Sequence, residues 1–130
     1  MYRSVVDEFD YVVVGGGSAG CVVAARLSED PSVRVCLLEA GGEGRDVLIR
    51  VPLGFATAMP NGINSWDFHT VPQAGFNGRR GFQPRGKTLG GSSAINAMIY
   101  ARGPRSDYDN WAAMGNPGWS FDEVLPYFKK

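Results

Sequence analysis

The chain has 130 residues, a formal net charge of zero and 44 % hydrophobic residues, which suffices for one domain with an ordinary core. The balanced charge gives no electrostatic basis for a nucleic-acid or membrane-surface partner, and no apolar run approaches bilayer length. The stretch MYRSVVDEFD lacks the apolar segment of a signal peptide, and Cys21 and Cys36 have neither metal-site nor redox-motif spacing. We therefore expect a cytoplasmic protein with two reduced thiols, no metal site and no transmembrane segment.

The chain is organised around residues 9–39, which predict a βαβ unit. An apolar run at 9–14 predicts a strand that is covered on both faces, and residues 18–28 predict a helix of small side chains. A second apolar run at 33–38 predicts a strand parallel to the first, because a βαβ crossover joins parallel strands. This order of elements predicts a Rossmann-like α/β fold.

Three glycines between the first strand and the helix form the pattern G-x-G-x-x-G, at Gly15, Gly17 and Gly20. Such a turn places free backbone N–H groups at a helix N-terminus, where they attract phosphate. Glu39 follows about 20 residues later, where an acid that binds ribose is expected. The pattern predicts dinucleotide binding, leaves NAD and FAD open, and disfavours NADP. A glycine-rich turn that binds nothing would explain one glycine well but three at this spacing poorly.

The middle of the chain, residues 41–83, shows no clear periodicity and predicts an irregular connection. Residues 55–59 predict one helical turn, and 66–71 alternate well enough for a short strand. Asn77-Gly78 is a hairpin-type turn signal, and residues 79–84 are the expected return strand.

A second glycine cluster, PRGKTLGGSS at 84–93, precedes the apolar stretch AINAMIY at 94–100, which predicts a helix or a tight turn. One interpretation is an ordinary loop that enters a helix with a serine N-cap. The other is a second approach of backbone to the same ligand, with Gly90-Gly91 leaving space, Ser92-Ser93 adding hydroxyls and Asn96 presenting an amide. The residue types alone do not decide between the two.

Two helices are predicted at the C-terminal end. Residues 106–114 form an amphipathic pattern, and Ser120 with Glu123 forms a capping box that begins a further helix. The inward positions of the first helix are expected to be Tyr108, Trp111 and Met114. Because a sheet of two parallel strands leaves its edges exposed, we expect the chain to be the front piece of a larger protein.

The second glycine cluster also carries a family resemblance. Residues 86–109, GKTLGGSSAINAMIYARGPRSDYD, resemble the signature of the glucose–methanol–choline (GMC) oxidoreductases, and the first cluster with LLEAGG resembles the FAD fingerprint of that family. The ending GWSFDEVLPYFKK is similar as well, so the resemblance spans residues 9–130. The wording is closest to choline dehydrogenases and alcohol dehydrogenase-like members. The resemblance implies a flavoprotein fold that is incomplete without the rest of the GMC protein.

On this resemblance the chain is an N-terminal FAD-binding portion with four parts. These are a dinucleotide unit at about 9–40, an irregular connection at 41–83, a flavin-contacting segment at about 84–103, and helices at 106–130. Residues implied to line the pyrophosphate are Gly15, Gly17, Ser18, Ala19 and Gly20, with Glu39 at the adenosine ribose. Residues implied to reach the flavin half are Gly90, Gly91, Ser92, Asn96, Ala97, Met98 and Ile99.

The implied reaction is oxidation of an alcohol or choline to an aldehyde, by hydride transfer to FAD, followed by reoxidation of the flavin by an electron acceptor. Ile95 stands where some members carry a histidine bonded to the flavin, so non-covalent FAD is implied. The family's catalytic histidine belongs to a region that this chain does not match, and His69 matches no catalytic element. We therefore expect no catalytic residue and no turnover from this chain alone. Alternatives are a non-catalytic FAD-binding subunit that needs a partner chain, or a small NAD-binding Rossmann protein.

Overall fold

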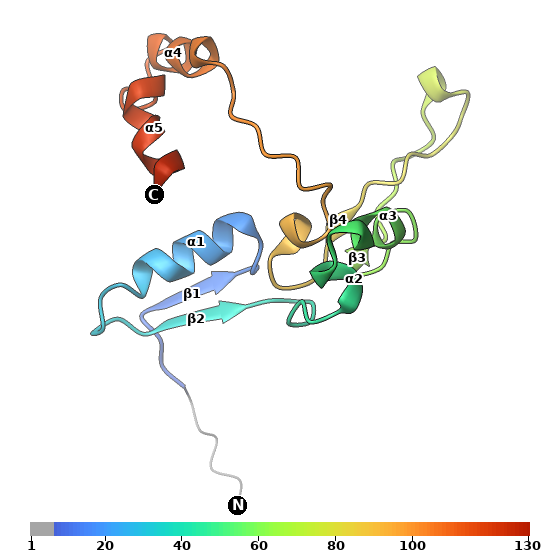
Figure 1. Ribbon diagram of the computed structural model, residues 1–130, viewed down its shortest axis with the longest axis horizontal. Coiled ribbons are helices and arrows are strands. Elements are labelled where there is room, and N and C mark those ends of the chain that lie inside the picture. The colour runs from blue at the N-terminus through green and yellow to red at the C-terminus, as the bar shows by residue number, and fades with distance from the viewer. Residues whose placement is uncertain (1–6) are drawn as a thin grey trace, which may run out of the picture. The chain divides into compact units, whose positions relative to one another are not determined.

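The computed structural model describes residues 7–130 and divides the chain into two compact units, with the boundary between Met98 and Ile99 (Figure 1). This boundary falls inside the segment 84–103, which was predicted to contact the flavin. None of the helices in the described residues is long and apolar enough to cross a membrane.

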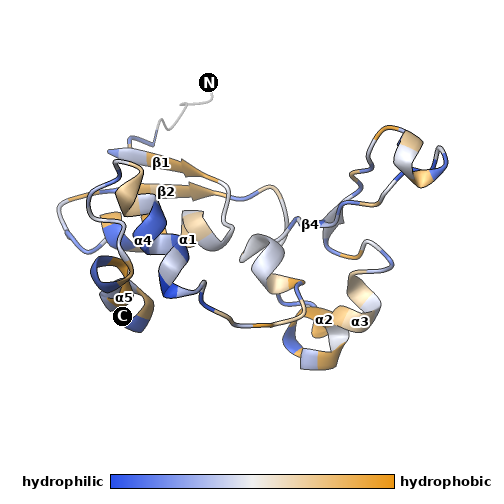
Figure 2. Cartoon of the chain, turned by 90° about the horizontal axis from the view of Figure 1, so that it is seen from above, coloured by the Kyte–Doolittle hydropathy of each residue, from blue (hydrophilic) through white to orange (hydrophobic). Residues whose placement is uncertain are grey.

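The first unit begins with the predicted βαβ arrangement. Strands β1 (Tyr11–Val14) and β2 (Val35–Leu38) are parallel, and helix α1 (Ser18–Leu27) connects them (Figure 1). Strand β2 and all of β1 after Tyr11 are hydrophobic, as their colour in Figure 2 shows. The register pairs Tyr11 with Val35 and Val14 with Leu38, so both strands end at the same edge of the sheet. The α/β fold class and the parallel pairing are confirmed.

Both strands start later than predicted because local hydrogen bonds replace the ladder at their first residues. The N–H of Arg34 donates to the Asp10 carboxylate at 2.7 Å, and the N–H of Asp10 donates to the Arg34 carbonyl at 2.9 Å. A side chain thus takes the place of a strand partner at this end of the sheet.

The connection after β2 is more regular than predicted. It contains α2 (Val47–Arg50), the 3₁₀ turn η1 (Pro52–Gly54) and α3 (Phe55–Ala58). The one-turn helix expected at 55–59 is therefore confirmed, whereas α2 and η1 were not predicted. Asp46 begins α2 as an N-cap, because its carboxylate accepts the Leu48 N–H at 2.8 Å.

A hairpin follows, with the turn in its predicted place and the strands elsewhere. Asn77 and Gly78 have φ angles of 53° and 74°, beside the 3₁₀ turn η2 (Ala74–Phe76). The paired strands are β3 (Ser65–Trp66) and β4 (Arg85–Gly86), antiparallel. The predicted return strand at 79–84 is wrong, and the predicted strand at 66–71 is mostly wrong. These segments form one isolated bridge, between His69 and Phe82, and a few hydrogen bonds but no continuous ladder, because the exposed arm buries no face.

Of the two possibilities predicted for 94–100, a helix or a tight turn, the helix does not form. The structure has a 3₁₀ turn, η3 (Gly91–Ala94), and no regular element from Ile95 to Tyr100. Two local features prevent a helix there. Asn96 accepts the Met98 N–H on its side-chain oxygen at 2.8 Å, and Met98 has a left-handed φ of 56°. The serines lie inside η3, so neither of them is an N-cap.

The second unit consists of α4 (Arg105–Ala113) and α5 (Phe121–Lys129), both close to their predicted positions. The capping box at Ser120 and Glu123 is confirmed. Tyr108 lies between the helices, with its ring centroid 5.2 Å from that of Trp111 and 5.8 Å from that of Phe121. Met114 was expected to point inward but is 65 % exposed, since the inward positions are filled by aromatic rings from α5.

Little of the apolar surface is buried. Ala58 and Ile95 are the only buried hydrophobic residues of the described chain, and Thr88 is the buried polar one, at 1 % exposed. Val14, at the end of β1, is 82 % exposed.

Candidate dinucleotide-binding site

A cleft of about 760 Å³ lies in the first unit, where β1 and β2 end and α1 begins. This is the edge at which open α/β sheets bind ligands. Most of the predicted site residues line it: Gly15, Gly17, Ser18, Ala19, Gly20, Glu39, Gly91 and Ser92. The fold thus brings both glycine clusters and the predicted acid to one cavity.

The three motif glycines meet different requirements. Gly15 has a φ of 100°, which side chains rarely adopt, and its N–H donates to the Leu38 carbonyl at 2.7 Å. A Cβ at Gly20 would lie 1.8 Å from the Gly15 carbonyl oxygen, so Gly20 allows the helix to approach the strand. A Cβ at Gly17 would meet only the Gly91 Cα, at 3.9 Å. Gly17 is therefore not required by packing and instead leaves free space at the cleft.

The N-terminus of α1 has no side-chain cap among the described residues. Its first residues, Ser18 and Ala19, both line the cleft. The first amides of a helix have no partner inside the helix, and the helix dipole is positive at this end. This end of α1 can therefore hold a phosphate group.

The Glu39 carboxylate joins two loops that border the cleft. One oxygen, Oε2, accepts the Gly16 N–H at 2.7 Å, and Oε1 accepts the Gly41 N–H at 2.9 Å. Since an ionised carboxylate has about four acceptor positions, it retains capacity for hydroxyl donors. Glu39 is thus placed to hold the glycine turn and to accept hydrogen bonds from a ribose.

The two glycine clusters touch through their backbones. The Gly90 N–H donates to the Gly16 carbonyl at 2.7 Å, and a Cβ at Gly91 would lie 2.7 Å from the Gly17 Cα. Of the two interpretations that the sequence left open, the structure therefore favours an approach of the second cluster to the same cleft. An ordinary loop that enters a helix is not what forms.

Other predicted residues of the flavin half lie outside the cleft lining. Gly90 supports the lining through its bond to Gly16 but does not itself border the cavity. Asn96 and Met98 border a separate small cavity of about 90 Å³ beside α2, and Ala97 is exposed. Ile99 belongs to the second unit.

Trp66 and Arg85 line the cleft as well, although they were not among the predicted site residues. The pairing of β3 with β4 places them opposite each other, and the Arg85 N–H donates to the Ser65 hydroxyl at 3.0 Å. Arg85 belongs to the second glycine cluster, so its position in the sequence was a usable signal. Trp66 had no such signal, because its place depends on a pairing across 19 residues.

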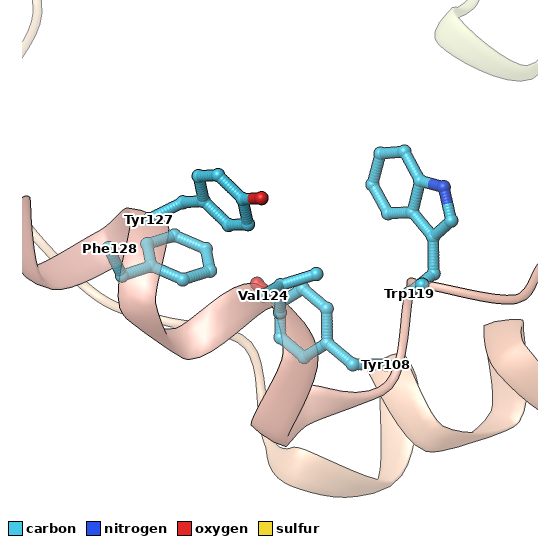
Figure 3. A pocket seen from close by; sticks show the side chains of 6 residues that line it. Tyr108, Trp119, Val124, Tyr127 and Phe128 are labelled. Carbon is cyan, nitrogen blue, oxygen red and sulfur yellow. The ribbon is translucent and has the colours of Figure 1, made fainter.

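A second cavity, of about 470 Å³, lies in the second unit between α4 and α5 (Figure 3). The labelled side chains around it are Tyr108, Trp119, Val124, Tyr127 and Phe128. No charged group lines it, and it has no helix N-terminus rich in glycine. Its chemistry suits apolar contacts rather than phosphate.

His69 lies in the hairpin, away from the cleft lining. Its Nδ1 is 3.4 Å from the Asp67 carboxylate, and its ring is 5.2 Å from that of Phe82. The described residues hold no group of three or more His, Cys, Asp or Glu that could bind a metal ion. The histidine thus has one carboxylate neighbour and lies apart from the residues that line the cleft.

Comparison with known proteins identifies a common family. The family model described as GMC oxidoreductase matches residues 9–130. The chain is 52 % identical over 122 residues to an alcohol dehydrogenase (acceptor) of Pseudomonas putida, covering 94 % of this chain and 22 % of the relative. It is 48 % identical to an oxygen-dependent choline dehydrogenase of Photobacterium profundum, with the same coverage.

Solved structures agree with the sequence comparison. The pyridoxine 4-oxidase from Mesorbium loti matches 93 % of this chain with a TM-score of 0.84 and 46 % identity, over 24 % of its own chain. A formate oxidase from Aspergillus oryzae, studied for its FAD modification, matches 92 % of this chain with a TM-score of 0.80 and 36 % identity, over 21 % of its own chain. The chain thus spans about a fifth of the length of the relatives that it matches.

Proposed function

We propose that this chain, which belongs to the GMC oxidoreductase family, binds FAD in the cleft between the two glycine clusters. The cofactor would be held without a covalent bond. One observation carries this proposal. The Gly90 N–H of the second cluster donates to the Gly16 carbonyl of the first, and other residues of both clusters line one cavity. A cavity with a second glycine segment suits a ligand that extends beyond one nucleotide.

The residues of the cleft fit the chemical groups of FAD. The uncapped end of α1 faces the cavity beside Gly17, where the absence of a side chain leaves room for the diphosphate. Glu39 would accept hydrogen bonds from the adenosine ribose. Arg85 lines the same cavity, and its positive charge would offset part of the phosphate charge.

We further propose that the second cluster extends toward the flavin half of the cofactor. Gly91 and Ser92 border the cleft and would lie nearest the flavin. The other residues that we propose to reach the flavin half are Gly90, Asn96, Ala97, Met98 and Ile99. Non-covalent binding is supported by Ile95, which is 4 % exposed and offers no nucleophilic atom at the position where some relatives carry a linked histidine.

The proposed reaction is oxidation of an alcohol, with choline as one candidate, by an oxidoreductase of which this chain is the FAD-binding part. When bound, FAD accepts the hydride that leaves the alcohol carbon. This chain's residues hold and orient the cofactor, whereas the base that removes the hydroxyl proton is expected from outside it. A separate chain that supplies this base is an alternative arrangement.

Titration of the purified protein with FAD tests the binding proposal. FAD fluorescence should be quenched on binding, whereas NAD⁺ should not compete, and ADP should compete weakly because it has half of the ligand. Acid precipitation should release all flavin into the supernatant. NAD⁺ binding without FAD binding would overturn the cofactor assignment, and flavin retained in the pellet would overturn non-covalent binding.

A dye-reduction assay with choline and simple alcohols tests the assignment of roles. The chain with FAD bound should not reduce the dye with any of these substrates. Turnover by the purified chain would overturn the proposal that the base lies outside it.

A further inference from the structure

Thr88 is the most deeply buried polar side chain in the described part of the chain, at 1 % exposed. Its hydroxyl donates to the Gly42 carbonyl at 3.0 Å, across 46 residues of sequence. The same carbonyl accepts the Leu89 N–H at 2.8 Å. Thr88 does not line the cleft, so its hydroxyl serves contact between loops and not contact with a ligand.

The bond from Thr88 closes a ring of hydrogen bonds around the cleft. From Gly42 the chain leads back to Gly41, whose N–H binds Glu39, and the other oxygen of Glu39 binds the Gly16 N–H. The Gly16 carbonyl then accepts the Gly90 N–H, two residues beyond Thr88. Every loop in this ring borders the proposed phosphate or flavin position. Within this ring of hydrogen bonds, the side chains come from Thr88 and Glu39.

The fit between these loops leaves no space for adjustment by other side chains. A Cβ at Gly41 would lie 2.0 Å from the Lys87 carbonyl oxygen. Gly42 and Thr88 also form an isolated parallel bridge. The backbones are in direct contact, and the buried hydroxyl adds a side-chain hydrogen bond to the backbone bonds of Leu89 and Gly90 that hold their register.

We infer that Thr88 is a positioning residue, which fastens the second glycine cluster to the first and so prearranges the cleft for its cofactor. This inference rests on the proposed function. Without the hydroxyl, FAD would have to order the loops as it binds, and the cost of that ordering would appear as lower affinity.

Three variants isolate the hydroxyl. Thr88→Val removes it at nearly constant volume, whereas Thr88→Ser keeps it and loses a methyl group. Thr70→Val is the matched control, because the Thr70 hydroxyl also makes one bond between chain segments, to the Gly81 N–H at 2.9 Å, but lies in the hairpin. Should Thr88→Val fail to fold, the comparison of Thr88→Ala with Thr88→Ser repeats the test without the methyl group in either protein.

Two measurements are made on each variant: amide hydrogen exchange of Leu89 and Gly90 in the ligand-free protein, and FAD affinity. In Thr88→Val the exchange rate of these amides and the dissociation constant for FAD should each rise about fivefold, as expected for loss of one hydrogen bond. Thr88→Ser and Thr70→Val should leave both close to the unsubstituted protein.

Each other outcome decides a separate point. Unchanged exchange in Thr88→Val would overturn the linkage between the loops. Faster exchange with unchanged FAD affinity would overturn the positioning role. If the unsubstituted protein failed to bind FAD, the proposed function and the cofactor role of Thr88 would fall together, while exchange would still decide whether Thr88 joins the loops.

Discussion

Gly17→Val is the substitution that best separates ligand binding from folding. Gly17 has φ −78° and ψ −171°, an extended conformation open to any residue. Its Cβ would meet only the Gly91 Cα, at the ordinary contact distance of 3.9 Å. A valine side chain should therefore be accepted by the fold but would occupy the space in front of the α1 N-terminus. That space is where the diphosphate is proposed to lie.

The size of the effect follows from what the phosphate would lose. A phosphate displaced from two backbone amides gives up hydrogen bonds to a charged group, worth about 1.5–3 kcal/mol each. FAD affinity should fall by at least about 100-fold, since each 1.4 kcal/mol changes a dissociation constant about tenfold. Stability should change by only about 1 kcal/mol, because Gly17 is an N-cap and valine is less favoured there.

The assay is calorimetric titration with FAD, together with thermal melts of each variant. Gly75→Val is the matched control, because a Cβ at Gly75 has nothing within 4 Å and this glycine does not line the cleft. Gly20→Ala provides the contrast: its Cβ would lie 1.8 Å from the Gly15 carbonyl oxygen, so it should lower the melting midpoint before any ligand is added. Retained FAD affinity in folded Gly17→Val would refute this placement of the phosphate.

Glu39→Gln should weaken FAD binding and cost about 1–3 kcal/mol of stability in chemical denaturation, because an amide cannot accept from both backbone N–H groups that the carboxylate binds. An unchanged midpoint would contradict this. In the second unit, hydrogen bonds from Arg105 hold the pKa of Asp122 below its ordinary value. The stabilisation is present above the ordinary pKa and is lost as pH falls through the lowered one, so tryptophan fluorescence in a Trp66→Phe background should change below about pH 4. Asp122→Asn should weaken this acid response, and an unaltered acid transition would count against the ion pair.

The sequence was informative where structure depends on short-range patterns. The βαβ unit follows from two apolar runs around a glycine turn, and the capping box at Ser120 follows from one offset of three residues. The hairpin turn at Asn77-Gly78 follows from the left-handed preference of both residues. In these places one residue pattern and one local geometry correspond, so the prediction needed no knowledge of distant contacts.

It was less informative where several conformations compete or where partners are distant. The stretch from Ala94 to Tyr100 has the composition of a helix, but the side chain of Asn96 satisfies the Met98 N–H and ends any helical path. The return strand predicted at 79–84 does not form, because the hairpin arm buries no apolar face that would set a register. The approach of Thr88 to Gly42 spans 46 residues and has no periodicity that a sequence could show.

The small core leads to a last prediction, that the stability of the first unit depends strongly on its ligand. Ala58 and Ile95 are its only buried hydrophobic residues within 7–98, while Val14 at the cleft is 82 % exposed. Burial of apolar surface normally offsets chain entropy, and here that contribution is small.

A ligand that binds only the folded form adds about 2.7 kcal/mol at 100 times its dissociation constant, so the melting midpoint should rise steadily with FAD concentration. Gly17→Val should remove this rise and Gly75→Val should keep it. A ligand-free chain that unfolds cooperatively with the denaturant m-value of a well-packed domain of 130 residues would contradict the argument, because such a value requires more buried surface than these loops provide.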